Sequence, residues 1–148
     1  MMLIMPAIFD KSGVTFQYPE NWTLEVDNPQ PGEIAATVTS PTGAFWSVAM
    51  HPRQAEPLQL TDTVLEAMRQ EYPGLEAESV AETIEGHELV GHNLNFFYVD
   101  LVGTAQIRAV RLPWTTFAIH CQGEDREFGK IEPVFQAMTF SLLKSSAK

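Results

Sequence analysis

The chain has 148 residues, of which 45% are hydrophobic and 19% charged, a balance typical of one folded domain with a sizeable core and not of a disordered chain. Acidic residues outnumber basic ones by 19 to 9, giving a formal net charge of -10. This net negative charge repels nucleic acid and anionic lipid, because binding to either depends on basic side chains. It suits solubility, or a partner that carries a basic patch.

Cysteine usage and the lack of a long apolar stretch bear on the compartment. Cys121 is the only cysteine, so a secreted scaffold held by intramolecular disulfides is excluded. Residues 1–9 are apolar, but they lack a basic segment and contain Pro6, unlike a signal peptide. No other stretch has the length and apolarity of a membrane span. We therefore expect a cytoplasmic protein without membrane insertion.

The N-terminal third predicts short antiparallel strands joined by turns. Residues 8–18 form a hairpin pattern, with Gly13 supplying the positive φ angle of the turn. Trp22 follows a proline-led turn directly before the next strand, so we expect it to pack inside against a helix. Two more strands are expected over residues 34–39 and 44–50.

A first helix is expected over about residues 61–72. Apolar side chains recur there on one helical face, and Pro73 follows the last of them. Thr63 and Glu66 can form a capping box at its start, although Asp62 could cap the helix instead.

The stretch from residue 75 to residue 121 predicts a meander of antiparallel strands. Valine, isoleucine, threonine and aromatic residues dominate it, as they do in strands. Glu85-Gly86, residues 100–103 and residues 112–114 mark the turns.

A second helical pattern begins near residues 123–125, where acidic side chains suit the positive end of a helix. Pro133 removes a backbone donor, so we expect a kink or a restart there. Residues 139–143 are expected to form a short final strand. Few helices separated by runs of strands predict an α+β fold: one domain over residues 1–148, with a twisted antiparallel sheet and about two main helices.

Three short motifs resemble the Mog/PsbP-like superfamily. Tyr-Pro-Glu-Asn-Trp at 18–22, after a strand at 13–16, resembles the family's opening strand and Y-P-x-x-W motif. Ile-Glu-Gly-His at 84–87 is similar to the entry to its central strands. Residues 128–141 are similar to its last helix and following strand.

The resemblance implies an antiparallel sheet flanked by helices, but no single function. The superfamily includes PsbP-like proteins such as an extrinsic photosystem II subunit, a Ran-binding nuclear import factor, DcrB-like envelope proteins and chaperones of type VI secretion effectors. No catalytic residue is common to these members.

The histidines and the cysteine are the candidates for catalysis or metal binding. His120 and Cys121 are neighbours in a strand, so their side chains point to opposite faces and cannot form a dyad. Cys121 is expected to be a buried small hydrophobe. His87 and His92 have opposite parity in one strand, whereas His92 and His120 could be cross-strand neighbours. We expect no metal site and no cofactor.

A polar and aromatic face of the central strands is the candidate for binding. By alternation, three side chains share a face of one strand and two share a face of the next, while two tryptophans could rim a cleft. The alternative is a sheet face that is solvated, or covered by a helix with its polar groups satisfied. The candidate residues are Asn93, Asn95, Phe97, Gln106, Arg108, Trp46 and Trp114.

These patterns favour a non-enzymatic accessory, adaptor or chaperone-like domain that binds another protein, basic or amphipathic in character. The alternative is a small-molecule-binding or metal-dependent enzyme that uses the polar face of the central strands. An aliphatic groove would favour the chaperone, and convergence of His92, His120 and a carboxylate would favour the enzyme. The oligomeric state is left open, a homodimer included.

Overall fold

The computed structural model describes residues 6–146. The N-terminal segment that lacks signal-peptide features therefore lies mostly outside the described residues. The two helices are α1 (Pro57–Glu71) and α2 (Asp125–Ser145). The strands are β1 (Pro6–Lys11), β2 (Val14–Pro19), β3 (Thr23–Asp27), β4 (Ala35–Thr39), β5 (Phe45–His51), β6 (Glu76–Ile84), β7 (His87–Tyr98), β8 (Leu101–Arg111) and β9 (Thr116–Glu124).

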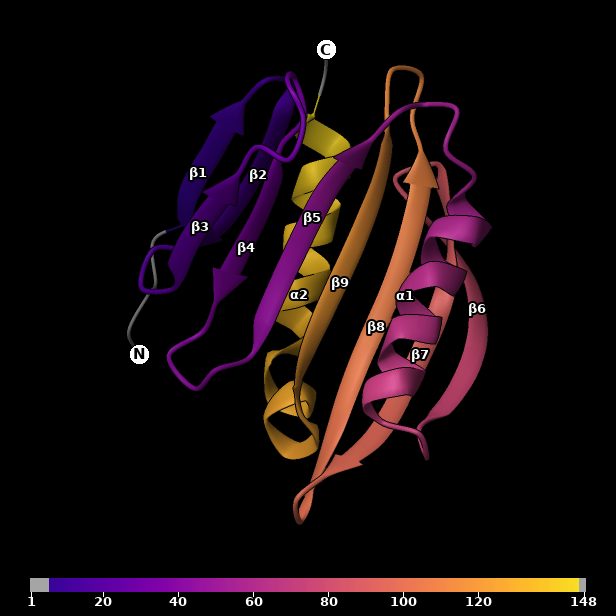
Figure 1. Cartoon of the computed structure of the whole chain (residues 1–148). Helices are drawn as coiled ribbons and strands as arrows, with labels where there is room; N and C mark the ends of the chain where they lie inside the picture. The colour runs from indigo at the N-terminus through magenta and orange to yellow at the C-terminus, as the bar shows by residue number, and fades with distance from the viewer. Residues whose placement is uncertain (1–5, 147–148) are drawn as a thin grey trace.

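Seven strands form one antiparallel sheet, and β1 and β2 form a separate hairpin (Figure 1). The order across the large sheet is β3-β4-β5-β9-β8-β7-β6. The chain crosses from β5 through α1 to the far edge at β6, then returns strand by strand until β9 pairs with β5. The expected α+β fold with an antiparallel sheet and two main helices is confirmed.

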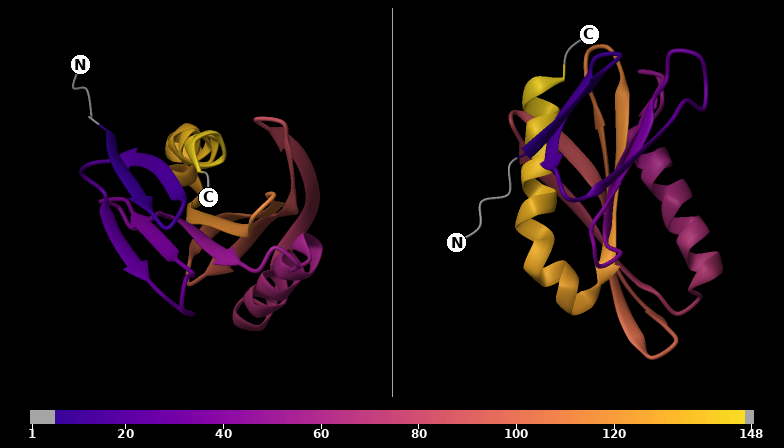
Figure 2. Two further views of the ribbon diagram at one scale, coloured as in Figure 1. Left: turned by 90° about the horizontal axis from the view of Figure 1, so that it is seen from above. Right: turned by 90° about the vertical axis from the view of Figure 1, so that its left-hand side faces the viewer.

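The two helices cover opposite faces of the sheet (Figure 2). Helix α2 and the β1–β2 hairpin enclose the larger core, in which Phe16, Trp46 and Phe135 are almost wholly buried. Helix α1 covers β7 and β8 on the other face, over a smaller cluster that includes Met68 and Phe96. Because α2 lies over only part of its face, a groove remains open beside it along part of β6–β8, while Leu89 on the same face is buried.

Trp22 anchors the start of β3 to helix α2, as the sequence predicts. Only 9% of its surface is exposed, and its ring meets the ring of Phe135 edge-on with 5.9 Å between centroids. The proline-led turn closes with a hydrogen bond from the Trp22 N–H to the Pro19 carbonyl oxygen, 3.0 Å long. The expectation that Trp22 packs inside against a helix is confirmed.

The expected start of the first helix is wrong. Helix α1 begins at Pro57 instead of near residue 61, because proline has a φ angle that suits the first turn. The Thr63 hydroxyl donates to the Gln59 carbonyl within the helix, so it forms no capping box with Glu66.

Of the kink or restart expected near Pro133, the restart is wrong, and so is the final strand expected over 139–143. Helix α2 continues through Pro133 to Ser145. Phe135, Met138 and Leu142 are buried at helical spacing, so tertiary packing sustains the helix beyond the proline. Within residues 6–146, no helix has the length and apolarity that crossing a membrane requires.

Candidate functional site

The predicted polar residues of β7 and β8 come together on the face of the sheet that α2 covers in part. Asn93 pairs with Gln106, and Arg108 pairs with Gly91, so the side chains of the two strands share one face. Asn95 lies two residues further along β7 and points the same way. Four of the seven predicted binding residues are therefore neighbours.

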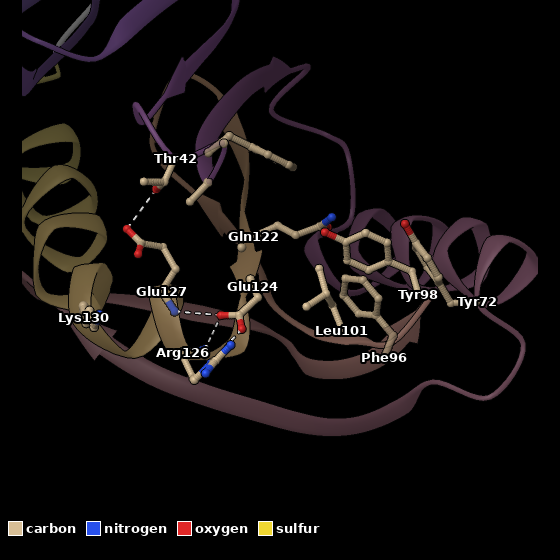
Figure 3. A pocket seen from close by; sticks show the side chains of 14 residues that line it. Thr42, Tyr72, Phe96, Tyr98, Leu101, Gln122, Glu124, Arg126, Glu127 and Lys130 are labelled. Atoms are coloured by element: carbon tan, nitrogen blue, oxygen red, sulfur yellow. Dashed lines mark hydrogen bonds and ion pairs between the residues drawn. The ribbon is translucent and has the colours of Figure 1, made fainter.

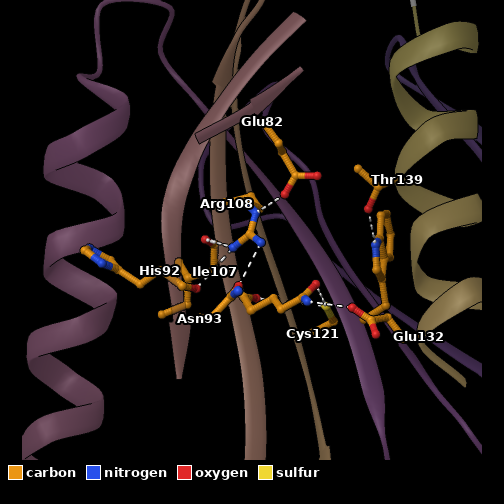
Figure 4. A network of polar contacts seen from close by, with 10 residues as sticks. Glu82, His92, Asn93, Ile107, Arg108, Cys121, Glu132 and Thr139 are labelled. Atoms are coloured by element: carbon orange, nitrogen blue, oxygen red, sulfur yellow. Dashed lines mark hydrogen bonds and ion pairs between the residues drawn. The ribbon is translucent and has the colours of Figure 1, made fainter. Parts of the chain in front are cut away.

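Arg108 is the centre of a hydrogen-bond network on this face (Figure 4). It is only 7% exposed, and its Nε donates to Glu82 Oε2 at 2.6 Å. Its Nη1 donates to the carbonyl oxygens of His92 and Ile107, and its Nη2 donates to Asn93 Oδ1 at 2.8 Å. The guanidinium thus ties β6, β7 and β8 together, and Glu82 balances its charge.

Gly91 permits the close approach of β7 and β8 at this point. A Cβ atom built on residue 91 would lie 1.8 Å from the Ile107 carbonyl oxygen, far inside contact distance. Glycine is therefore the residue that fits opposite Arg108 without moving a strand.

A groove of about 540 Å³ lies between α2 and the β6–β8 side of the sheet. Four carboxylates line it, from Glu76 and Glu78 in β6 and from Asp125 and Glu132 in α2. In the described part of the chain, no Lys or Arg lines this groove. We call it the acidic groove. Its other lining residues are Ala77, Asn93, Leu94, Asn95, Thr104, Gln106, Phe128 and Gly129.

Hydrogen bonds hold two of these carboxylates in place. Gln106 Nε2 donates to Glu132 Oε2 at 2.9 Å, which links β8 to α2 across the groove. The Thr104 hydroxyl donates to Asp125 Oδ1 at 2.7 Å and accepts from Asn95 Nδ2 at 3.0 Å. The floor of the groove is therefore preorganised before anything binds.

None of the four carboxylates of the acidic groove joins an ion pair within residues 6–146. Glu76 and Glu78 are both exposed on the edge strand β6. Like charges gathered along one groove repel one another and create a local field that attracts cations.

A smaller cavity of about 210 Å³ shares Gln106 and Glu132 with the acidic groove. Arg108 and Cys121 also line it, and apolar side chains of the core close it. Cys121 is 5% exposed, as expected for a buried small residue, and burial raises the pKa of its thiol to about 12. The thiol therefore stays protonated at neutral pH.

Four predicted binding residues lie outside the acidic groove, and Arg108 among them lines the smaller cavity beside it. Trp46 does not rim a cleft: it is fully buried, and its Nε1 donates to Thr139 Oγ1 of α2 at 3.0 Å. Trp114 lies in the β8–β9 turn, where its ring meets Phe117 edge-on. Phe97 lies near the β7–β8 turn and is 68% exposed. Strand alternation indicated that Phe97 shares a face with Asn93 and Asn95, but it could not show which parts of that face α2 covers.

His92 and His120 lie on the opposite face, separated in the register by Ile107. His92 Nε2 is 3.0 Å from Asp62 Oδ1 in α1, and His120 Nε2 is 3.0 Å from Gln122 Oε1. Burial lowers the pKa of His120, which favours its neutral form. Among the described residues, no cluster of three or more His, Cys, Asp or Glu side chains is placed to hold a metal ion.

A larger hollow, of about 1010 Å³, lies where β9 passes into α2 (Figure 3). Tyr72, Phe96 and Tyr98 form its aromatic wall, with 4.4 Å between the ring centroids of Tyr72 and Phe96. Arg126 and Lys130 stand on the opposite wall together with two glutamates. Its mixed charge gives it less electrostatic preference than the acidic groove has.

Sequence reasoning missed the acidic side chains of the groove. Glu76 and Glu78 alternate with small residues along β6, which was a usable signal for one charged strand face. The position of Glu132 beside Gln106 depends on how α2 packs across the sheet, and no local pattern reveals that packing.

Comparisons with known proteins identify the fold. A scan of protein-family models and a search of curated protein sequences give no match. The structure is similar to cyanobacterial PsbP (CyanoP) from Synechocystis, with a TM-score of 0.67 and 11% identity over 95% of this chain and 92% of that one. It is also similar to PA94 from Pseudomonas aeruginosa, a protein of unknown function, with a TM-score of 0.51 and 11% identity over 93% of this chain and 95% of that one. The chain therefore has the PsbP-like fold that the sequence predicts.

Proposed function

We propose that this chain is a non-enzymatic accessory, adaptor or chaperone-like protein that works in the cytoplasm. It binds a basic or amphipathic segment of another polypeptide in the acidic groove. The observation that carries the proposal is the lining of that groove, which holds four carboxylates and, in the described part of the chain, no Lys or Arg.

The chemistry of the groove suits an extended basic segment. Lys or Arg side chains of a partner would neutralise Glu76 and Glu78, and each such solvent-exposed pair contributes about 0.2–1 kcal/mol. The side-chain amides of Asn93 and Gln106 line the same groove and offer hydrogen bonds to a partner's backbone. Several weak pairs acting together would give specificity through charge and register.

The charge of the whole molecule supports the same partner. A formal net charge of -10 attracts a basic polypeptide over a long range and raises its rate of encounter. The partner-binding members of the Mog/PsbP-like superfamily add support at the level of fold analogy.

The cysteine and the two histidines of the central strands give less support to the enzyme alternative than the acidic groove gives to partner binding. The Cys121 thiol has a pKa raised to about 12, which keeps it from acting as a thiolate near neutral pH. His92 and His120 lie on the other face of the sheet and are engaged by separate partners. His92, His120 and a carboxylate therefore do not meet at one site, as they would if the enzyme alternative were favoured.

The test is recovery of partners from the native cell by the tagged protein, followed by mass spectrometry. The groove variant carries Glu76→Gln, Glu78→Gln and Glu132→Gln. The matched control carries Glu20→Gln, Glu25→Gln and Glu66→Gln, which change three exposed glutamates away from the groove. Both variants lose the same charge, so only the position of the charge differs.

We expect wild type and control to recover the same protein, and the groove variant to recover about tenfold less, as the loss of two or three such charge pairs predicts. Recovery should also fall between 0.1 M and 1 M salt, because the screening length drops from about 10 Å to about 3 Å. Equal losses in the two variants, or saturable turnover of a small molecule without any specific partner, would contradict the proposal.

A further inference from the structure

The β7–β8 hairpin ends in an apolar tip that the acidic groove does not use. Five of the nine exposed large hydrophobic residues among residues 6–146 fall within this one stretch of six residues. Val99 is 94% exposed and Phe97 is 68% exposed. Figure 1 shows the hairpin projecting beyond the neighbouring strands at the lower end of the sheet. The apolar tip consists of Phe97, Tyr98, Val99, Leu101 and Val102.

The apolar tip is hydrophobic on both faces of the hairpin. Phe97 pairs with Val102 and Tyr98 pairs with Leu101, so the two pairs point to opposite sides and Val99 lies at the turn between them. A flat partner surface would bury only one of these pairs. A socket that surrounds the tip would bury both.

The turn itself is strained where its apolar side chain is most exposed. The two-residue turns at Ser12-Gly13 and Glu85-Gly86 adopt positive φ angles at both positions and include a glycine. In the β7–β8 turn the positive φ angle, 56°, belongs to Val99. A β-branched residue is disfavoured there, and at 94% exposure its side chain gains little burial in return. The positive φ angle of Val99 therefore lowers the stability of the fold while the apolar side chain of Val99 points into solvent.

We propose that the apolar tip inserts into an apolar socket of a partner protein, and that basic side chains rim this socket. Asp100 is the only charged residue between Asn95 and Gln106, so a basic rim complements the one charge at the tip. Asn95 pairs with Glu76, which places the acidic groove directly beside the base of the tip. A bilayer fits less well, because this stretch lacks the Lys or Arg that anionic headgroups attract.

The inference that the socket belongs to the same basic partner that binds the acidic groove rests on the proposed function. The inference that the apolar tip contacts a partner does not rest on it, because that contact uses different residues. The groove variant and the variants of the tip therefore separate failure of the one from failure of the other.

The experiment places the photo-crosslinking residue benzoylphenylalanine at position 99 in the native cell. The matched control places it at Glu85, which is also exposed and also has a positive φ angle in a hairpin turn, at 51°. We expect one protein to be crosslinked from position 99 and not from position 85. Sequencing should map the crosslink to an apolar segment flanked by Lys or Arg. Adducts with lipid, equal yields at both positions, or no adduct would overturn the proposal.

A second variant, Val99→Gly, distinguishes binding from folding. Glycine relieves the left-handed strain, so the thermal midpoint should rise. Recovery of the crosslinked protein by the tagged variant should nevertheless fall several-fold. A higher midpoint with unchanged recovery would show that the apolar side chain serves no contact, and would overturn the proposal. If the groove variant keeps its partner while Val99→Gly loses it, the tip proposal stands and the groove proposal fails.

Discussion

At the scale of single residues, Cys121 can report on the opening of the core. It is the only cysteine, and burial under α2 raises the pKa of its thiol to about 12 although the nearby Arg108 charge lowers it. Labelling by a disulfide reagent at mildly alkaline pH should be about a thousandfold slower in the native protein than in the urea-unfolded chain, where the pKa returns to about 8.5. If the native protein were labelled as fast as the unfolded chain, the smaller cavity beside Cys121 would be open to solvent.

Trp22 tests how the N-terminal strands are anchored to α2. Replacement by alanine removes a side chain that is 9% exposed and packs on Phe135, so Trp22→Ala should lower the free energy of unfolding by about 3–5 kcal/mol. The half-buried Trp114 is the matched control, and Trp114→Ala should cost clearly less. Urea titration of the two variants decides the question, since equal losses would contradict the anchoring role of Trp22.

At the scale of elements, the start of α2 makes a prediction about pH. Glu124 is the N-cap, and its carboxylate accepts the backbone N–H groups of Glu127 and Arg126. The bond from Glu127, followed by the Arg126 side chain, lowers the pKa of Glu124. A pKa lowered in the folded state gives stability that is complete above the unfolded pKa and is lost as pH falls toward the folded pKa.

The variant Glu124→Gln should therefore be less stable than wild type at neutral pH, and the difference should shrink as pH falls through the acidic range. Glu66→Gln, on an exposed face of α1, removes the same charge without removing a helix cap and serves as the control. Thermal midpoints measured across this range test the prediction, and parallel curves for wild type and Glu124→Gln would contradict it.

Elements that depend on local patterns could be predicted, and those that depend on packing could not. Glycine turns and alternation located the hairpin around Gly13 and the meander from residue 75 to residue 121. The strand expected over 139–143 failed because apolar residues there suit either a strand or a helix. The packing of Leu142 on the larger core decides for the helix.

The candidate site shows the same limit. Alternation predicted the faces of Asn93, Asn95, Gln106 and Arg108, and the strand register brings them together. Trp46 was expected at the rim of a cleft only because it is aromatic, and the sequence does not tell that α2 covers it.

At the scale of the whole molecule, charge and apolar surface are distributed unevenly. The acidic groove and the apolar tip adjoin through the Asn95–Glu76 pair. One partner with a basic segment beside an apolar protrusion would engage both. The unequal coverage of the sheet by α2, which buries Trp46 and leaves Glu78 exposed, creates this arrangement.

In the proposed function, the acidic groove binds basic polypeptide. The most direct test titrates the isotope-labelled protein with a short peptide of alternating Lys and Leu and follows backbone amide shifts by NMR. Shifts are expected to concentrate on Glu78, Asn93, Asn95 and Gln106, to weaken with added salt, and to vanish in the groove variant but not in the matched control. Shifts spread evenly over all exposed acidic residues, or unchanged in the groove variant, would contradict the account.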